Sequence, residues 1–324
     1  MKKIVVIIPV SKSEDSRVVL NSVKKNVSLD YENLITKIVY AVDVNSENDE
    51  RIKLLKKEGV EVFSRHSKGK RAGAINEALI SLADFKPDYV ALFDVDSRPA
   101  RNFVTECVDA LENDSMGYIA SSRRYISNPL NLVSRTIQAE YYALNFLLKR
   151  SAFKQFNGLI GVLRADLLYK HKLNEGAITE DADYATRMHA RGYKAILVNT
   201  TRIYEQSPVR WRDLLSQRKR WYYGALQLGR YWNVVKRSKN KKFIRSWVMA
   251  LTMTYGIILF FPFVIVSPFI ILIYSKKASP KLSPSVSAGL VLYILALQYA
   301  AIAAIFNFAR GRSVEWKSMK RVGW

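Results

Sequence analysis

Short apolar runs alternate with amphipathic stretches over residues 3 to about 125 of the 324-residue chain. Five of the runs are rich in β-branched residues and end at turn residues, which is typical of strands: Lys3–Pro9, Lys37–Asp43, Val60–Ser64, Tyr89–Asp94 and Gly117–Ser122. The stretches between them carry apolar residues at helical spacing, which predicts helices: Asp15–Val27, Asn48–Glu58, Arg71–Ala83 and Ala100–Glu112. This alternation predicts an α/β fold, with a Rossmann-like and mostly parallel sheet that is covered by helices.

The pattern is less regular after residue 125. Asn131–Lys149 has the spacing of an amphipathic helix, but no clear period follows through Phe156–Leu168. A further helix is expected from about Glu180 to Arg191, because Gly192 is a common stop signal. Lys194–Val198 would then return to the sheet.

Two segments near the C-terminus are long and apolar and contain no charged residue, Trp247–Tyr274 and Val286–Ala309. Each is long enough to span the hydrocarbon core of a bilayer. Because Ser275–Ser285 leaves room only for a turn, the two segments predict a transmembrane hairpin of two helices. The alternative is a buried helical hairpin in a soluble protein.

The formal net charge of +23 favours nucleic acid, anionic lipid or phosphorylated substrates as partners. The basic residues crowd into Arg202–Arg245 and Arg310–Arg321, on either side of the apolar segments. That distribution is typical of the cytoplasmic flanks of a membrane protein rather than of a nucleic-acid groove. We therefore expect a cell-membrane protein whose catalytic part faces the cytoplasm. Within these flanks, Arg210–Trp232 mixes aromatic and basic residues and suits helices at the head-group level.

Two further features narrow the class of protein. The single cysteine, Cys107, excludes an internal disulfide and a cysteine-rich zinc site. The first apolar run ends at Pro9, which is too early for the core of a signal peptide.

The most informative pattern is Asp94-Val-Asp96, which directly follows an apolar strand. Side chains at positions i and i+2 of a strand share a face, so both carboxylates would lie together at the carboxyl end of the sheet, where α/β folds bind ligands. Two carboxylates that close favour a divalent cation whose remaining ligands are phosphate oxygens. The alternative is a solvated loop after a buried strand.

Other segments have weaker signals of the same kind. A basic, glycine-containing loop opens a helix at Lys68-Gly69-Lys70-Arg71, an arrangement that favours a diphosphate. Thr179 is a candidate helix cap, and the acids Glu180, Asp181 and Asp183 that follow it would by themselves do no more than complement the helix dipole.

Taken together, these segments resemble the motifs of family 2 glycosyltransferases in their order and approximate spacing. The matching elements are the strand that ends at Asp43, the Gly69-Lys70-Arg71 loop, Asp94-Val-Asp96, Thr179-Glu180-Asp181 and Gln217-x-x-Arg220-Trp221. That family has the GT-A fold and uses nucleotide diphosphate sugars as donors. The Gln-x-x-Arg-Trp element is similar to that of the membrane-bound branch, which includes cellulose and hyaluronan synthases and ceramide and diacylglycerol glucosyltransferases. The resemblance covers roughly residues 3–232.

The resemblance implies a role for each matching residue. Asp43 and Asp94 would contact the nucleotide, Lys70 would lie near the donor, and Arg220 would meet the pyrophosphate. Asp96 would bind Mg²⁺ or Mn²⁺, and Asp181 would be the general base. Trp221 and the Asn157-Gly158 loop would contact the acceptor, with Glu180 and Gln217 in supporting positions.

The chain is therefore expected to divide into four parts. Residues 1–204 would form the GT-A catalytic domain, and residues 205–245 would be basic aromatic interfacial helices that complete the active site. Residues 246–310 would be the transmembrane hairpin, followed by a basic cytoplasmic tail over 311–324.

The expected activity is inverting, metal-dependent transfer of a sugar to a membrane-embedded lipid, with a UDP-sugar favoured on family grounds. A single hairpin does not by itself enclose a channel for a growing polymer, so a processive polysaccharide synthase, which a homo-oligomer would permit, is the alternative. A non-catalytic, membrane-anchored nucleotide-sugar-binding subunit and a nucleotidyltransferase are the other hypotheses.

Overall fold

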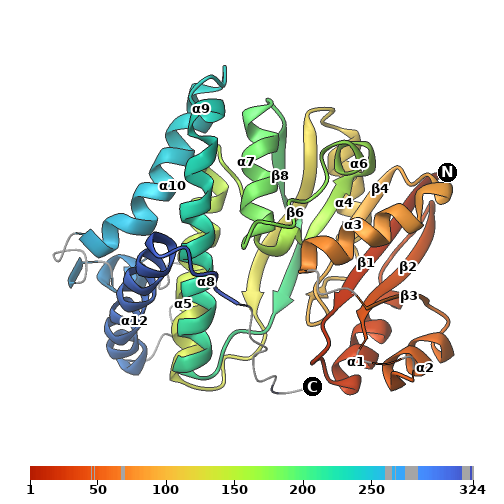
Figure 1. Cartoon of the computed structure of the whole chain (residues 1–324), viewed down its shortest axis with the longest axis horizontal. Helices are drawn as coiled ribbons and strands as arrows, with labels where there is room; N and C mark the ends of the chain where they lie inside the picture. The colour runs from red at the N-terminus through yellow and green to blue at the C-terminus, as the bar shows by residue number, and fades with distance from the viewer. Residues whose placement is uncertain are drawn as a thin grey trace.

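The computed structural model describes residues 1–44, 46, 48–66, 70–259, 265–266, 268–273, 284–315 and 322. An eight-stranded sheet lies at the centre, in the order β3-β2-β1-β4-β7-β6-β8-β5 (Figure 1). The strands are β1 (Lys2–Val10), β2 (Leu34–Asp43), β3 (Glu61–Arg65), β4 (Tyr89–Leu92), β5 (Arg98–Pro99), β6 (Gly117–Ile126), β7 (Gly161–Arg164) and β8 (Lys194–Glu205). The larger helices are α1 (Ser16–Val27), α2 (Glu50–Lys57), α3 (Arg71–Ser81), α4 (Phe103–Glu112), α5 (Leu132–Arg150), α6 (Ala165–His171), α7 (Glu180–Ala190), α8 (Trp211–Gln227), α10 (Lys241–Leu259) and α12 (Pro284–Ala309).

One half of the sheet has the predicted parallel arrangement. β1 pairs in parallel with both β2 and β4, and β2 pairs in parallel with β3. The other half is mixed, because β7 runs antiparallel to β4 and β6 while β6 and β8 are parallel. β7 and α6 lie in the Phe156–Leu168 stretch, for which the sequence predicts neither. A four-residue strand with three buried positions is too short to show an alternating pattern.

The sheet is buried on both faces, as the continuous apolar runs require. Alternate residues of β1 point into two separate cores. Val5 and Ile7 pack with α3, α6 and α7, whereas Ile4, Val6 and Ile8 pack with α1 and α4. Parallel strands covered in this way bring their carboxyl ends to one edge of the sheet.

A buried aromatic cluster joins α7 to the first turns of α10. The ring of His189 on α7 stacks on Phe243 of α10 at 5.4 Å between centroids, and its edge meets Phe153 and Tyr118. Its Nε2 lies 3.1 Å from the carbonyl oxygen of Lys154, which can only accept, so Nε2 carries the proton. Burial lowers the pKa of His189 from 6.5 to about 4.

This shift predicts a loss of stability in acid. His189 folds as the neutral ring, so its contribution is complete above its ordinary pKa of 6.5 and is lost as the pH falls toward 4. The full effect is about 3 kcal/mol of unfolding free energy. Chemical denaturation of the detergent-solubilised chain at several pH values measures it, and His189→Phe should flatten the slope. A His171→Gln variant, which alters a histidine outside the cluster, should keep most of the slope; an unchanged slope in His189→Phe would contradict the assignment.

A third apolar cluster gathers α5, α8 and α12 at the end of the molecule away from α1 and α2 (Figure 1). One side of α12 packs on α5 and α8 through residues such as Tyr293, Leu297 and Ala301. Its other side exposes large apolar residues, among them Leu292, Tyr299 and Phe306. The helix therefore presents one face to protein and one apolar face outward.

The expected pair of spans is only partly covered by the structure. Among the described residues, one helix is long and apolar enough to cross a membrane, Ala288–Ala309, with a mean hydropathy of 2.1. The other expected span begins at Trp247, but that side chain is 2% exposed and its indole Nε1 donates to Thr186 Oγ1 of α7 at 3.1 Å. One face of the start of α10 is thus packed against the protein core. Residues 260–264, 267 and 274 of the same prediction, and the turn over 275–283, lie outside the described residues.

Candidate active site

The acids predicted for the nucleotide and the metal stand at the carboxyl ends of β2 and β4, two parallel strands that flank β1. Asp43 ends β2, and Asp94 and Asp96 come after β4. Asp43 Oδ1 lies 3.2 Å from Arg65 Nη1. Burial raises the pKa of Asp43, although the Arg65 guanidinium opposes the shift. The carboxylate is therefore held in place by a buried cation at the edge of the sheet.

The two acids of the Asp-x-Asp pattern differ in exposure. β4 ends at Leu92, and the turn that follows is closed by a 2.9 Å hydrogen bond from Ser97 N to the Asp94 carbonyl oxygen. The strand rule that predicts a shared face therefore does not apply to this pair. The Asp94 side chain is 39% exposed, whereas Asp96 as a whole is 8% exposed. Asp94 is therefore the more exposed of the two acids, and Asp96 is the more buried.

Arg71 links the donor-side acid to the predicted base segment. Its Nε donates to Asp94 Oδ1 at 2.8 Å, and its Nη1 donates to Glu180 Oε1 at 2.9 Å. Burial alone would lower the pKa of this guanidinium, but the carboxylates of Asp94 and Glu180 outweigh it and raise the pKa. Nη2 is buried and has no hydrogen-bond partner within the described part of the chain.

The family resemblance implies a place near the donor for the neighbouring residue, Lys70. Lys70 precedes α3, and its side chain is exposed. No contact between Lys70 and the acids is found among the described residues, whereas Arg71 contacts two of them. Lys68 and Gly69 of the same loop lie outside the described residues. In the sequence, Arg71 could have been distinguished from Lys70 by its position in the first turn of a predicted helix whose start faces the acids.

Gly158 lies between the acids from two different segments. Its backbone N–H donates to Asp181 Oδ2 at 2.6 Å, and a Cβ on this residue would lie 3.2 Å from Asp94 Oδ2. Its φ of +64° is a conformation that favours glycine. The Asn157-Gly158 loop, predicted to touch the acceptor, is therefore packed directly against Asp94 and Asp181. The carbonyl oxygen of Asn157 accepts a hydrogen bond from Arg124 Nη2.

Glu180 and Asp181 occupy the first turn of α7. Burial raises the pKa of Glu180; the Arg71 guanidinium opposes this shift, and the Asp181 charge adds to it. Arg220 on α8 also acts on Glu180 electrostatically, and its Nη1 donates to the carbonyl oxygen of Ile178 at 3.4 Å. The predicted Arg220 therefore reaches the same end of α7 as the predicted base.

Close packing fixes α8 against this end of α7. A Cβ on Gly224 would lie 2.2 Å from Thr179 Oγ1, so only glycine fits there. Gln227 Oε1 accepts from Ile178 N at 2.8 Å, one turn farther along α8. Neither residue was predicted, and no sequence motif marks them. They place Arg220 beside the acids.

The other residues of the Gln-x-x-Arg-Trp element face a different environment. The guanidinium carbon of Arg218 lies 4.2 Å from the centroid of the Trp221 ring. Arg218 is itself buried and pairs with Glu140 of α5 at 2.5 Å. Trp221 is half-buried, and Gln217 lies one turn before it on α8. A buried ion pair between α8 and α5 thus lies against the ring of the predicted acceptor residue, Trp221.

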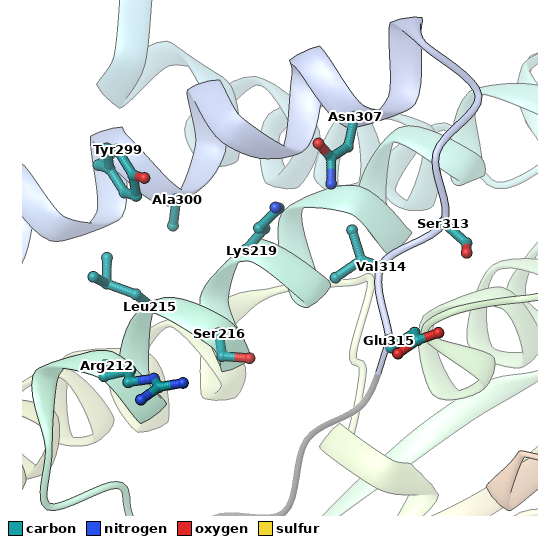
Figure 2. A pocket seen from close by; sticks show the side chains of 10 residues that line it. All are labelled: Arg212, Leu215, Ser216, Lys219, Tyr299, Ala300, Asn307, Ser313, Val314 and Glu315. Atoms are coloured by element: carbon teal, nitrogen blue, oxygen red, sulfur yellow. The ribbon is translucent and has the colours of Figure 1, made fainter.

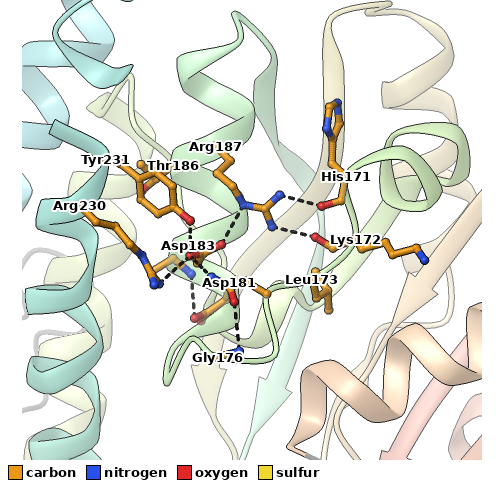
Figure 3. Close-up of polar contacts among 12 residues, drawn as sticks. His171, Lys172, Leu173, Gly176, Asp181, Asp183, Thr186, Arg187, Arg230 and Tyr231 are labelled. Atoms are coloured by element: carbon orange, nitrogen blue, oxygen red, sulfur yellow. Dashed lines mark hydrogen bonds and ion pairs between the residues drawn. The ribbon is translucent and has the colours of Figure 1, made fainter. Parts of the chain in front are cut away.

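Asp183 is fully buried, and its carboxylate is the centre of a hydrogen-bond network next to the first turn of α7 (Figure 3). Its Oδ1 accepts from Arg187 Nε at 2.8 Å. Its Oδ2 accepts from Tyr231 Oη at 2.7 Å, from Arg230 Nη2 at 3.0 Å and from Asn174 Nδ2 at 3.0 Å. Arg187 continues to the carbonyl oxygens of His171 and Lys172. The network ties α7 to the turn after α8 and to the loop before α7.

A groove of about 380 Å³ lies on another side of α8, between α8, α12 and residues 313–315 (Figure 2). Arg212, Ser216 and Lys219 of α8 point into it, with Tyr299 and Asn307 of α12 opposite. None of the predicted donor, metal, base or acceptor residues lines this groove. It is separate from the cluster of acids around Gly158.

Comparison with known proteins agrees with this geometry. The protein-family model described as "Glycosyl transferase family group 2" matches residues 89–306, and the model described as "Glycosyl transferase family 2" matches residues 5–172. The chain belongs to glycosyltransferase family 2. Its mixed α/β fold is of the GT-A type.

Two curated relatives are plant enzymes. "Glucomannan 4-beta-mannosyltransferase 7" of Arabidopsis thaliana is 28% identical over 204 residues, which are 60% of this chain and 37% of the relative. "Probable glucomannan 4-beta-mannosyltransferase 7" of Oryza sativa subsp. japonica is 26% identical over 171 residues, 50% of this chain and 29% of the relative. The chain thus matches about a third of the length of these relatives.

Solved structures support the fold over nearly the whole chain. A mannosyltransferase, PcManGT from Pyrobaculum calidifontis, in complex with GDP-Man and Mn²⁺, superposes with a TM-score of 0.62 at 17% identity and covers 96% of this chain and 88% of its own. S. aureus TarS superposes with a TM-score of 0.52 at 13% identity, covering 95% of this chain and 54% of its own.

Proposed function

We propose that this chain transfers a sugar, with inversion, from a nucleoside diphosphate donor to a lipid acceptor at a membrane. The proposal rests above all on Gly158, against which Asp94 and Asp181 converge from two distant segments. The Arg71 guanidinium bridges the same Asp94 to Glu180. Such a group of acids and cations can neutralise a departing diphosphate and accept a proton in one place.

The cations near the acids favour an anionic donor. Arg71 Nη2 is a buried donor without a hydrogen-bond partner among the described residues, and a buried unpaired N–H is costly unless a ligand satisfies it. Arg220 is held beside the same acids by the packing of α8 on α7. A diphosphate would supply the missing acceptors. Asp43, at the end of β2 on the other side of β1, would contact the nucleoside part.

The acids of the site would bind a divalent cation only together with oxygen atoms of the donor and water. Within the described part of the chain, no group of three or more His, Cys, Asp or Glu side chains is arranged to hold a metal. Asp96, with Asp94 beside it, would therefore hold Mg²⁺ or Mn²⁺ together with diphosphate oxygens and water. The bound metal would offset charge that develops on the leaving diphosphate. Following the family resemblance, we assign the principal ligand role to Asp96.

Asp181 is the base in this mechanism. The Gly158 N–H fixes its Oδ2, and its Oδ1 accepts from Ala182 N at 2.8 Å, so the carboxylate has one orientation. It would take the proton of an acceptor hydroxyl that attacks the sugar opposite the leaving diphosphate. A retaining mechanism of the two-carboxylate type would need a nucleophile as well, and the proposal requires none.

The acceptor and the location are inferred from α8, α10 and α12. The Arg218 guanidinium beside Trp221 also lies 5.7 Å from the ring centroid of Tyr293 on α12, and the outer face of α12 is apolar. We propose an acceptor that is embedded in a membrane, with the catalytic domain on the cytoplasmic side and two spanning helices. The donor stays open between uridine, which the family resemblance favours, and guanosine, which a mannosyltransferase relationship favours.

A processive polymerase is the second candidate. The curated relatives are named as glucomannan mannosyltransferases. A polymer product would distinguish a processive polymerase from an enzyme that transfers a single sugar to a lipid. A donor screen with GDP-mannose and UDP-hexoses, on the full chain in lipid, followed by mass analysis of the product, separates the two. Binding of a nucleotide sugar without transfer or hydrolysis would favour the non-catalytic subunit, and release of inorganic pyrophosphate from a nucleoside triphosphate would favour nucleotidyl transfer.

Asp96→Ala tests the metal assignment. Losing a ligand is expected to raise the Mn²⁺ concentration for half-maximal donor binding by at least about tenfold. Titration of Mn²⁺ against fluorescent nucleotide displacement measures this, with Asp84→Ala, at an exposed acid, as the control. An unchanged metal titration in Asp96→Ala would remove Asp96 from the metal site.

A further inference from the structure

A strongly cationic segment lies outside the site described above. No Asp or Glu occurs between Leu214 and Val314. Within that stretch, six Lys and Arg residues fall in the ten positions from Lys236 to Arg245, and all six are exposed: Lys236, Arg237, Lys239, Lys241, Lys242 and Arg245. No salt bridge from any of them is found among the described residues. We call these six residues the cationic segment.

The backbone of the cationic segment is anchored to the protein core. Val235 and Phe243 are completely buried, and Trp247 stacks on Trp232 at 6.4 Å between centroids. The Asn240 side chain accepts from Phe243 N at 3.0 Å and so caps the first turn of α10. Because these residues point inward, the cations are held on the outside of a fixed scaffold.

The outward face of α10 changes character along its length. Lys241, Lys242 and Arg245 occupy its first turns, and Val248, Met249 and Met253 continue the same face, since residues three or four apart share a side of a helix. Met249 is 60% and Met253 51% exposed. The change from cations to large apolar side chains takes place over about 12 Å, from Lys241 to Met249, at 1.5 Å per residue.

We propose that this face binds the anionic surface of a lipid leaflet, with the cationic segment at the level of the lipid phosphates and Met249 and Met253 among the acyl chains. Along the axis of α10, Met249 lies about 12 Å beyond Lys241, which is more than the roughly 5–8 Å of head-group region on each side of a bilayer, so a helix that enters the leaflet carries Met249 into the acyl chains. Trp232, which is 48% exposed beside the cations, is a residue type that favours the same level. A nucleic acid would use the cations but leave the methionines in water. The inference rests on the membrane location that we propose for the enzyme and adds the lipid chemistry and the surface.

The first test measures dependence on anionic lipid. The full chain, purified in detergent, is diluted into vesicles of phosphatidylcholine with or without phosphatidylglycerol and recovered by flotation. Phosphatidylglycerol should raise the recovered fraction, and added salt should lower it. The triple variant Lys241→Gln, Lys242→Gln, Arg245→Gln should lose about 100-fold of the phosphatidylglycerol-dependent partition, from roughly fivefold for each cation near an anionic surface.

A matched variant controls for net charge. Lys53→Gln, Lys56→Gln, Lys57→Gln removes three exposed cations from α2, at the opposite end of the molecule from α10 (Figure 1). It should partition like the wild type. Equal losses in both triple variants, or none in either, would overturn the assignment of the surface.

The second test measures depth. An environment-sensitive dye on Met249→Cys should shift to the blue when phosphatidylglycerol vesicles are added, whereas the same dye on Lys57→Cys should not; Cys107 is fully buried and does not compete for label. A dye on Met249→Cys that stays in water would overturn the proposal. So would tight binding of a labelled oligonucleotide that the α10 variant abolishes, without any effect of phosphatidylglycerol. Donor binding in detergent tests the transferase separately, so failure of either proposal can be told from failure of the other.

Discussion

Replacing Asp181 by asparagine is expected to slow sugar transfer to a hydroxyl acceptor by about 10²–10⁴-fold, which is the usual contribution of a positioned general base. Asparagine has the same shape, and its single side-chain oxygen can still accept from the Gly158 N–H that now lies 2.6 Å from Asp181 Oδ2, although its amide nitrogen cannot accept from Ala182 N. The variant should therefore lose the proton acceptor and keep the arrangement of the loop. Donor affinity should change little, because Arg71 and Arg220 are untouched.

The measurement separates binding from chemistry. Donor affinity is measured by nucleotide displacement, and the transfer rate by radiolabel from the same donor into product. Asp166→Asn, which alters an exposed acid on α6, serves as the control and should transfer at the wild-type rate. Wild-type turnover in Asp181→Asn would remove this residue as the base, and a matching loss of donor affinity would assign it to donor binding instead.

Replacing Asp183 by alanine is expected to cost about 3–5 kcal/mol of unfolding free energy, the usual effect of removing one partner from a buried ionic network. The carboxylate is fully buried and is the acceptor for Arg187, Arg230, Tyr231 and Asn174. Without it, two guanidinium groups lose their counter-charge. Since whole proteins are stable by only about 5–15 kcal/mol, we expect this variant to be recovered largely unfolded.

A milder change keeps the prediction measurable. Tyr231→Phe removes one hydrogen bond to the Asp183 carboxylate and should cost about 1.5–3 kcal/mol in chemical denaturation. Tyr299→Phe, on the exposed face of α12, is the matched control and should be neutral. A Tyr231→Phe variant as stable as the wild type would show that the network contributes no net stability.

The sequence alone was enough to propose the acids of the candidate site because each stands at the end of a recognisable element. Asp94 and Asp96 follow a buried strand, and Glu180 and Asp181 open a helix. Local pattern is enough for such residues, since the end of an element is marked by the change from apolar to polar positions. It did not identify Arg71 over Lys70, because both are basic and adjacent, and only the direction of the first turn of α3 decides which side chain meets Asp94.

Some positions could not be found from pattern at all. Gly224 matters because Thr179 packs against it from a segment 45 positions earlier. In the sequence, Asp183 is one more acid at the start of a helix. Its role in the buried network depends on Arg230 and Tyr231, which come from a later part of the chain. Contacts of this kind leave no local period in the sequence.

For the fold, the sequence by itself determined the alternating strands and helices of the first 125 residues, because each is stabilised by a repeating pattern of burial along its own length. It also determined the charge of the C-terminal part and the apolar character of α12. Only the tertiary structure decided that β7 enters the sheet antiparallel and that Trp247 packs against α7. An apolar side chain is driven out of water equally by a protein core and by lipid, so composition alone does not choose between them.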